Sequence, residues 1–147
     1  MRVLLASDHA GFALKATLIE FVRELGHDAV DLGPSDESAV DYPTFAHLLA
    51  ALLGKGDGER GILVCGTGIG VSMTANRHPG IRAALCHDAF TAEAARRHND
   101  ANVLCLGGRV TGPGVAMQIV RLFLVTPFEG GRHARRVELI ERKESTS

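Results

Sequence analysis

The residues from 61 to 72 constrain the fold of this chain more than any other stretch. A short apolar run ends at Cys65, and three glycines follow it at alternate positions, namely Gly66, Gly68 and Gly70. The apolar run predicts a buried strand, and the glycines predict a tight turn whose backbone N–H groups point outward to hold an anion. Residues 69–76 have the apolar spacing of a helix, so the turn should lie where the helix dipole favours negative charge.

The rest of the chain repeats this alternation of short apolar runs and amphipathic segments. We expect strands at 3–7, 27–32, 61–65, 81–86 and 103–106, and helices at 12–25, 44–53, 69–76, 88–98, 115–125 and 132–143. This order predicts an α/β fold, a single-domain, Rossmann-like three-layer sandwich with a five-stranded parallel sheet and helices on both faces. We expect the domain to span residues 1–143, followed by a polar tail at 144–147. Residues 33–43 form a loop long enough to carry function.

Composition excludes several classes of protein. The chain has 147 residues, 46% of them hydrophobic and 22% charged, and a net charge of −1 without any block of like charges. Binding to nucleic acid or to a membrane surface is therefore not expected, and no apolar run reaches the length of a membrane span. The three cysteines lie in or at the end of apolar runs, which is typical of buried thiols in a reducing cytoplasm. Their spacing does not predict a metal site.

Polar residues follow several of the predicted strands. They are Asp8 and His9, Cys65 to Thr67, His87 and Asp88, and Gly107 to Arg109. Ligands bind at the carboxyl ends of parallel strands, so these groups should meet at one edge of the sheet. Any one of them alone is more often a helix cap than a catalyst, and Asp88 in particular has the position of an N-cap. Their convergence favours a binding or catalytic site.

A second set of polar residues belongs to helices. Arg132 and Arg136 are four residues apart, so they share one helix face and could grip one phosphate, although a solvated face has the same pattern. His98 ends a helix, where a simple capping role is the alternative. Crossover helices run antiparallel to the strands, so His98 and Asn99 should lie at the sheet edge opposite Cys65. If both groups act on one substrate, the site must be shared between subunits, which predicts an oligomer.

Six separated motifs carry a resemblance to a known family. They are Ser7-Asp8-His9-Ala10-Gly11, Asp41-Tyr42-Pro43, Cys65-Gly66-Thr67-Gly68-Ile69-Gly70, Arg97-His98-Asn99-Asp100, Gly107-Gly108-Arg109, and Gly130-Gly131-Arg132-His133 with Arg136. In this order they resemble the type B ribose-5-phosphate isomerases, part of a wider family of sugar-phosphate isomerases that includes galactose-6-phosphate and allose-6-phosphate enzymes. The resemblance runs nearly end to end, and only the tail after Glu141 lies outside it.

The resemblance implies interconversion of an aldose phosphate and a ketose phosphate through a cis-enediolate, without metal or organic cofactor. Cys65 would be the base that moves the proton between C1 and C2. His98 would assist opening of the furanose ring, with Asp8 as a helper. The enediolate oxygens would be held by Thr67 and by backbone N–H groups of the turn, from Gly66 through Gly68 to Gly70. Some members of the family carry serine in place of the cysteine and use a nearby glutamate, but no acid occurs between Cys65 and residue 76.

The resemblance also implies the groups that bind the substrate and the assembly that completes the site. The phosphate would be held by His9, Arg132 and Arg136, and the site would be lined by Tyr42, Asn99 and Arg109. The family is dimeric or larger, so we expect a homodimer or a dimer of dimers with sites shared between chains. Cys86 and Cys105 are interpreted as structural thiols.

Other functions remain as alternatives. A hexose-6-phosphate substrate, allose or galactose, would require the same residues. A dinucleotide-binding module would need a third glycine where this chain has Val71. A thiol phosphatase would need an arginine at that same position. A sugar-phosphate sensor without catalysis would keep the fold.

Overall fold

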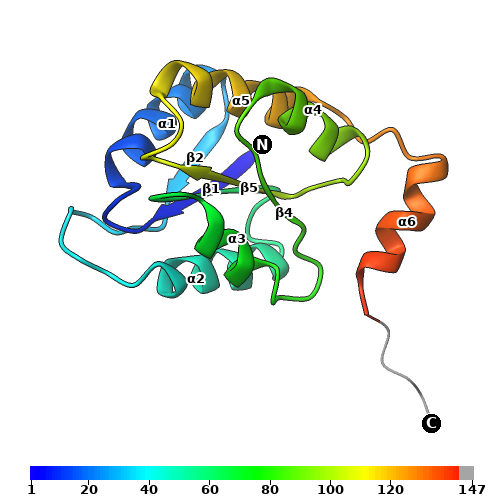
Figure 1. Cartoon of the computed structure of the whole chain (residues 1–147), viewed down its shortest axis with the longest axis horizontal. Coiled ribbons are helices and arrows are strands. Elements are labelled where there is room, and N and C mark those ends of the chain that lie inside the picture. Colours follow the sequence, from blue (N-terminus) through cyan, green and yellow to red (C-terminus); the bar gives the residue numbers. More distant parts are fainter. Residues whose placement is uncertain (143–147) are drawn as a thin grey trace, which may run out of the picture.

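The computed structural model describes residues 1–142, and within them the chain forms one parallel sheet surrounded by helices (Figure 1). The strands are β1 (Arg2–Ser7), β2 (Asp28–Asp31), β3 (Arg60–Cys65), β4 (Ala83–Leu85) and β5 (Val103–Gly107). The helices are α1 (Phe12–Glu24), α2 (Tyr42–Gly54), α3 (Ile69–Ala75), α4 (Ala89–Arg97), α5 (Pro113–Val125) and α6 (Arg132–Ile140). The five strands are parallel and lie in the order β2-β1-β3-β5-β4. The predicted three-layer fold is confirmed.

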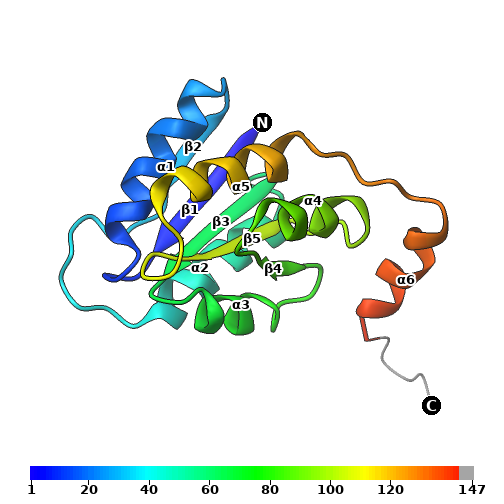
Figure 2. The ribbon, with the colours of Figure 1, turned by 45° about the horizontal axis from the view of Figure 1, so that its top comes forward.

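The central strand β3 contributes to both faces of the sheet, because successive side chains of a strand point in opposite directions. Ile62 and Val64 join a core with α1, α4 and α5, whereas Leu63 and Cys65 join a second core with α2 and α3. Figures 1 and 2 show the same division, with α1, α4 and α5 on one face of the sheet and α2 and α3 on the other. A sheet covered on both faces requires the continuous apolar strands seen in the sequence.

The order of the strands locates a ligand site. After β1 the chain adds β2 on one side, and it then crosses to place β3 on the other side. Such a switch leaves a crevice outside the carboxyl ends of the two neighbouring strands. In register, Ser7 of β1 pairs with Val64 of β3, and Cys65 pairs with Gly107 of β5. The residues that follow β1, β3 and β5 therefore emerge side by side.

Four boundaries differ from the prediction by two residues or more. The fourth strand covers only Ala83–Leu85, because Arg82 N–H donates to the Asn102 side chain (2.8 Å) and not to a strand partner. Helices α2 and α5 begin two residues earlier than expected, since each has proline in its first turn. Helix α6 ends at Ile140, with Glu141 in an extended conformation. Residue 143, predicted to end this helix, and the predicted tail 144–147 lie outside the described residues.

Helix α6 is the element least integrated into the domain. In Figures 1 and 2 it stands off the body, on the side away from the carboxyl end of β1. His133 is its buried residue, and its last turn exposes Leu139 and Ile140. No helix in the described part of the chain is long and apolar enough to cross a membrane.

Candidate functional site

Cys65 ends the central strand, and its thiol lies beneath the glycine turn. Its Sγ accepts a hydrogen bond from Gly68 N–H at 3.1 Å, and the residue is 5% exposed. Gly68 has φ of +81°, a conformation that favours glycine. The prediction that the N–H groups of the turn point outward is therefore wrong for Gly68, because the sulfur faces α3 and takes this donor itself. This hydrogen bond fixes the position of the sulfur at the end of β3.

The turn after β5 packs against the turn after β3. Gly108 N–H donates to the carbonyl of Cys65 (2.8 Å), and Arg109 N–H donates to the carbonyl of Gly66 (3.0 Å). A Cβ on Gly107 would stand 2.7 Å from the backbone of Thr67, so only glycine allows this approach. The thiol is thus held by backbone contacts between neighbouring strands and not by mobile side chains.

Asp8 and His9 emerge from β1 beside the same turn. The buried Asp8 carboxylate accepts a hydrogen bond from Gly11 N–H at 3.0 Å, so this side chain caps the turn that opens α1. The exposed His9 ring accepts a hydrogen bond from Val40 N–H through Nδ1 (3.2 Å). This bond ties the end of the loop before α2 to His9 and leaves Nε2 as the nitrogen that carries the proton in the neutral ring.

Three further predicted residues lie at this edge. Tyr42 opens α2, and a Cβ on Gly70 would stand 2.5 Å from its ring, so the ring packs against the turn. Arg109 Nη1 lies 3.5 Å from the point where a Cβ of Gly66 would stand. Thr67 is exposed, and its hydroxyl accepts a hydrogen bond from Ile69 N–H at 3.2 Å. The carboxyl edge therefore gathers a thiol, a carboxylate, an imidazole, a phenol and a guanidinium.

The remaining predicted residues lie at the other edge of the sheet. His98 caps the C-terminus of α4, its N–H donating to the carbonyl of Ala94 (2.9 Å), and Asn99 follows it. Helix α6 carries Arg132 in its first turn and Arg136 one turn later, both exposed. A cavity of about 320 Å³ is lined by His98, Asn99, His133, Arg136, Val137 and Ile140. Within one chain, the residues expected to form one site are thus divided between two opposite edges.

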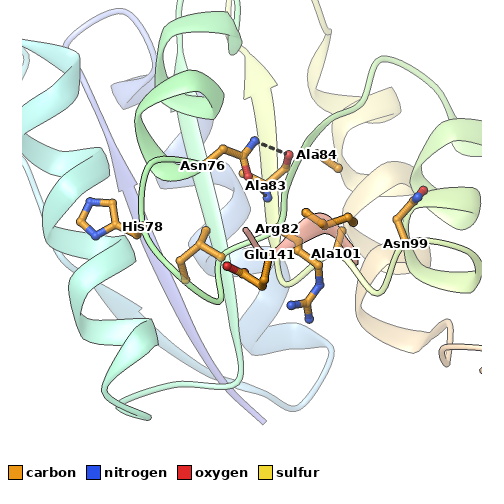
Figure 3. A pocket seen from close by; sticks show the side chains of 10 residues that line it. Asn76, His78, Arg82, Ala83, Ala84, Asn99, Ala101 and Glu141 are labelled. Carbon is orange, nitrogen blue, oxygen red and sulfur yellow. Dashed lines mark hydrogen bonds between the residues drawn. The ribbon is translucent and has the colours of Figure 1, made fainter. Parts of the chain in front are cut away.

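A second cavity adjoins this edge (Figure 3). It measures about 330 Å³ and lies between the turn after α3, the start of β4 and the end of α6, with Asn99 and Ile140 shared with the first cavity. Glu141 accepts a hydrogen bond from Gly80 N–H at 2.7 Å. This bond joins the end of α6 to the body of the domain.

The turn that carries His98 and Asn99 is fixed by residues that the sequence did not single out. Arg96 is 3% exposed and donates to Asp100 (2.9 Å) and to the carbonyls of Ala101 (2.6 Å) and Thr126 (3.2 Å). Arg82 donates to the backbone carbonyl of Asp100 at 2.8 Å. The sequence offers two adjacent arginines at 96 and 97 without a signal for which one is buried.

Two more residues missed by the sequence lie beside His98. The rings of His98 and His133 stack, with centroids 4.5 Å apart and planes inclined by 20°. Nε2 of His133 lies 3.5 Å from the Glu129 carboxylate. The only sequence signal is the spacing of four residues between Glu129 and His133, which is common on polar helix ends.

Burial holds the other two thiols in their neutral form. Burial raises the pKa of Cys86 to about 11 and raises the pKa of Cys105 well above its usual range, so both stay protonated at neutral pH. The predicted N-cap role of Asp88 is confirmed. Its carboxylate accepts a hydrogen bond from Thr91 N–H (2.7 Å), which also lowers the pKa of the carboxyl group.

The fold and the site define a class: parallel α/β domains with polar groups converging at the carboxyl edge, beside the switch in strand order. Residues 3–140 match the family described as Ribose/Galactose Isomerase. A putative sugar phosphate isomerase of Bacillus subtilis is 46% identical over 98% of this chain and 97% of that protein. Ribose-5-phosphate isomerase B of Escherichia coli is 41% identical over 95% of this chain and 93% of that protein.

Solved structures agree with this assignment. Ribose-5-phosphate isomerase B of Clostridium thermocellum superposes with a TM-score of 0.94 at 44% identity, over 95% of each chain. Type B ribose 5-phosphate isomerase of Trypanosoma brucei gives a TM-score of 0.92 at 48% identity, over 95% of each chain. The chain therefore belongs to the ribose/galactose isomerase family, and it is an isomerase, as the resemblance in the sequence implied.

Proposed function

We propose that this protein interconverts ribose 5-phosphate and ribulose 5-phosphate, with Cys65 as the base. The observation that carries the proposal is the thiol at the end of β3, held by the Gly68 N–H at 3.1 Å, in a chain of the ribose/galactose isomerase family. Relatives named ribose-5-phosphate isomerase B, at 41% identity or more, support the pentose as substrate. A hexose 6-phosphate is the second candidate, because the family description also includes galactose isomerases.

The proposed chemistry is a proton transfer between neighbouring carbons. The Cys65 thiolate removes the proton from C2 of the open-chain aldose, the C–H electrons form the C1–C2 double bond, and negative charge develops on O1. A proton then moves from O2 to O1, and the thiol returns its own proton to C1 to give the ketose. The Gly68 N–H already donates to the sulfur. Thr67 and the N–H groups of Gly66 and Gly70 stabilise the enediolate oxygens, and each such donor lowers the barrier by about 3 kcal/mol. No metal or organic cofactor enters these steps.

The groups for ring opening and phosphate binding come from both edges in this proposal. His98, helped by Asp8, moves the proton that opens the furanose ring, and Asn99 lines the site. Arg132 and Arg136 hold the phosphate together with His9, while Tyr42 and Arg109 line the sugar.

A second copy of the chain completes the site, because the thiol and His98 lie at opposite edges of one domain. We therefore propose a homodimer, or a dimer of dimers, in which Cys65 of one chain faces His98 and α6 of another. Large exposed apolar residues on α3, α4 and α6 support such contacts; they are Ile69, Met73, Phe90, Leu139 and Ile140, and Phe90 is 77% exposed. The unpaired state of all three cysteines supports a cytoplasmic location.

Two experiments test the proposal. A coupled assay of the purified protein should give the highest kcat/KM with ribose 5-phosphate, ahead of allose 6-phosphate and galactose 6-phosphate. A higher kcat/KM with either hexose 6-phosphate would identify that hexose phosphate as the substrate in place of the pentose.

The shared site is tested by mixing two inactive variants, Cys65→Ala and His98→Ala, and allowing the chains to exchange. In a random mixture, half of the dimers are mixed and each has one intact site, so about a quarter of wild-type activity should return. If the mixture stays inactive after exchange, or if a monomer is fully active, the site lies within one chain.

A further inference from the structure

We propose that His98, Glu129 and His133 form a binding site for Zn²⁺ and that its occupancy inhibits the enzyme. The ligand-capable atoms of these three side chains lie within 4.8 Å of one another. Two imidazoles and one carboxylate are a donor set that zinc sites of proteins use, with a fourth position left for water or substrate. The inhibitory part rests on the role proposed above for His98, whereas the binding part rests on the three side chains alone.

The geometry needs only a small adjustment to accept the ion. Ligand atoms around one tetrahedral zinc lie about 3.3 Å apart, given metal–nitrogen distances of about 2.0 Å. Nε2 of His133 and the Glu129 carboxylate are 3.5 Å apart. The wider separations in the cluster, up to 4.8 Å, must close by about 1.5 Å, and this falls on His98 and Glu129, whose side chains are exposed.

The backbone fixes where the three ligands start. Glu129 N–H donates to the carbonyl of Arg97 (3.1 Å), which joins the segment before α6 to the end of α4. His133 N–H donates to the carbonyl of Gly130 (3.0 Å), and its side chain is 10% exposed. His98 is the C-cap of α4, and its ring stacks on that of His133. The site is thus partly formed before any ion arrives.

The donor types of the cluster select against a hard cation. Arg136 lines the same cavity as His98 and His133, and Arg132 precedes it on α6. A magnesium or calcium ion requires several oxygen ligands, and this cluster offers one carboxylate. Imidazole nitrogens are good ligands for late transition metals, so the two histidines favour the binding of zinc. Zinc bound here would take a ring nitrogen of His98, the group proposed to open the sugar ring, and would lie in the cavity that Arg136 also lines.

The chain offers a matched control in a second histidine pair. His47 Nδ1 and His78 Nε2 lie 2.7 Å apart, on α2 and after α3. Among the described residues this pair has no third ligand close enough to join it. A His47→Ala variant therefore removes one imidazole from the protein without touching the proposed site.

The test measures zinc binding and zinc inhibition separately on the full-length, metal-free protein. Competition with a chromophoric chelator should show that Glu129→Gln and His133→Gln each weaken Zn²⁺ binding by tenfold or more, while His47→Ala binds zinc as the wild type does. In the isomerase assay, Glu129→Gln should keep the basal rate and need at least ten times more ZnCl₂ for half inhibition. Equal zinc affinity in Glu129→Gln and wild type would overturn the proposal, as would inhibition that this variant leaves unchanged.

The outcomes distinguish this inference from the proposed function. Zinc binding that depends on Glu129, in a protein that isomerises none of the sugar phosphates, keeps the metal site and removes the proposed reaction. Isomerase activity with zinc affinity unaffected by Glu129→Gln keeps the reaction and removes the metal site. Circular dichroism and the Tm of each variant should match the wild type, which is expected for Glu129 because its side chain is half exposed.

Discussion

The two edges of the sheet present polar groups in opposite ways. At the carboxyl edge, the Cys65 thiol is 5% exposed and is held by backbone bonds from Gly68 and Gly108 to its sulfur and carbonyl. At the amino edge, His98, Asn99 and Arg136 are exposed side chains that line one cavity. The first region is part of the core. The second lies on the surface, at the end of α4 and on α6, and α6 stands off the domain (Figure 2).

This difference agrees with the proposed division of roles between the two edges. A base that removes a proton from carbon must be positioned closely and shielded from water, which buried backbone contacts provide. A phosphate is grasped by long charged side chains, which function at a surface.

Removing the Cys65 thiol should lower activity more than any other change proposed here. A smaller loss would contradict the assignment of the base to the carboxyl edge. Cys65→Ala should lower kcat by about 100-fold or more, because it removes the proposed general base. Binding of ribose 5-phosphate, measured by calorimetry, should change little, since the proposed phosphate ligands His9, Arg132 and Arg136 are all retained. Retention of more than about a tenth of the rate would show that another group is the base.

Disturbing the backbone of the first region should lower stability as well as rate. Gly107→Ala would force a Cβ to 2.7 Å from the Thr67 backbone, so we expect the free energy of unfolding to fall by about 2 kcal/mol. Gly114→Ala is the control, because a Cβ there meets nothing within 4 Å and alanine favours the helix by up to about 1 kcal/mol. Urea denaturation of both variants measures the difference. Equal stability would mean that the two turns are not rigidly packed.

A substitution at the amino edge should change KM more than kcat. Arg136→Ala should raise KM for the sugar phosphate about tenfold, the effect of losing one charge-assisted hydrogen bond, with a smaller change in kcat. Arg135→Ala removes the same charge from the neighbouring position, which does not line the cavity of His98, and should leave KM nearly unchanged. If both variants raise KM equally, Arg136 acts only through its positive charge and does not contact the phosphate directly.

Cys86 should give the smallest effect and sharpens the contrast with Cys65. Its pKa is raised from 9.0 to about 11 by burial, so the folded state favours the neutral thiol. The stability that this neutral form contributes is present below pH 9 and is lost as the pH rises toward about 11. Cys86→Ser should change kcat less than twofold and leave the pH profile of activity below pH 9 unaltered. A shifted profile would implicate Cys86 in the proton transfer.

Much of the first region could be predicted from the sequence. The apolar run before Cys65 and the spacing of the glycines predicted the strand, the turn and helix α3, because each is a local property of the chain. The direction of the Gly68 N–H could not be predicted. It depends on which face of the sheet takes the Cys65 side chain, and that is decided by the packing of α2 and α3.

The second region was predictable only in outline. The topology of parallel sheets predicted the edge at which His98 and Asn99 lie, since a crossover helix must return the chain to the start of the next strand. The sequence did not identify the buried Arg96 that fixes this turn, nor the meeting of Glu129 and His133 with His98. These contacts join residues of α4 to the segment after α5, and a single sequence carries no signal for such pairs.

The sequence by itself determined the alternation of strands and helices, the positions of the polar groups at strand and helix ends, and the family. Apolar periodicity and glycine spacing depend on neighbouring residues alone, so they can be read from the sequence without a structure. Only the tertiary structure decided which donors meet the sulfur, which arginine is buried and that α6 stands away from the sheet. These features depend on how separate elements pack, and packing is fixed by contacts between residues far apart in the chain.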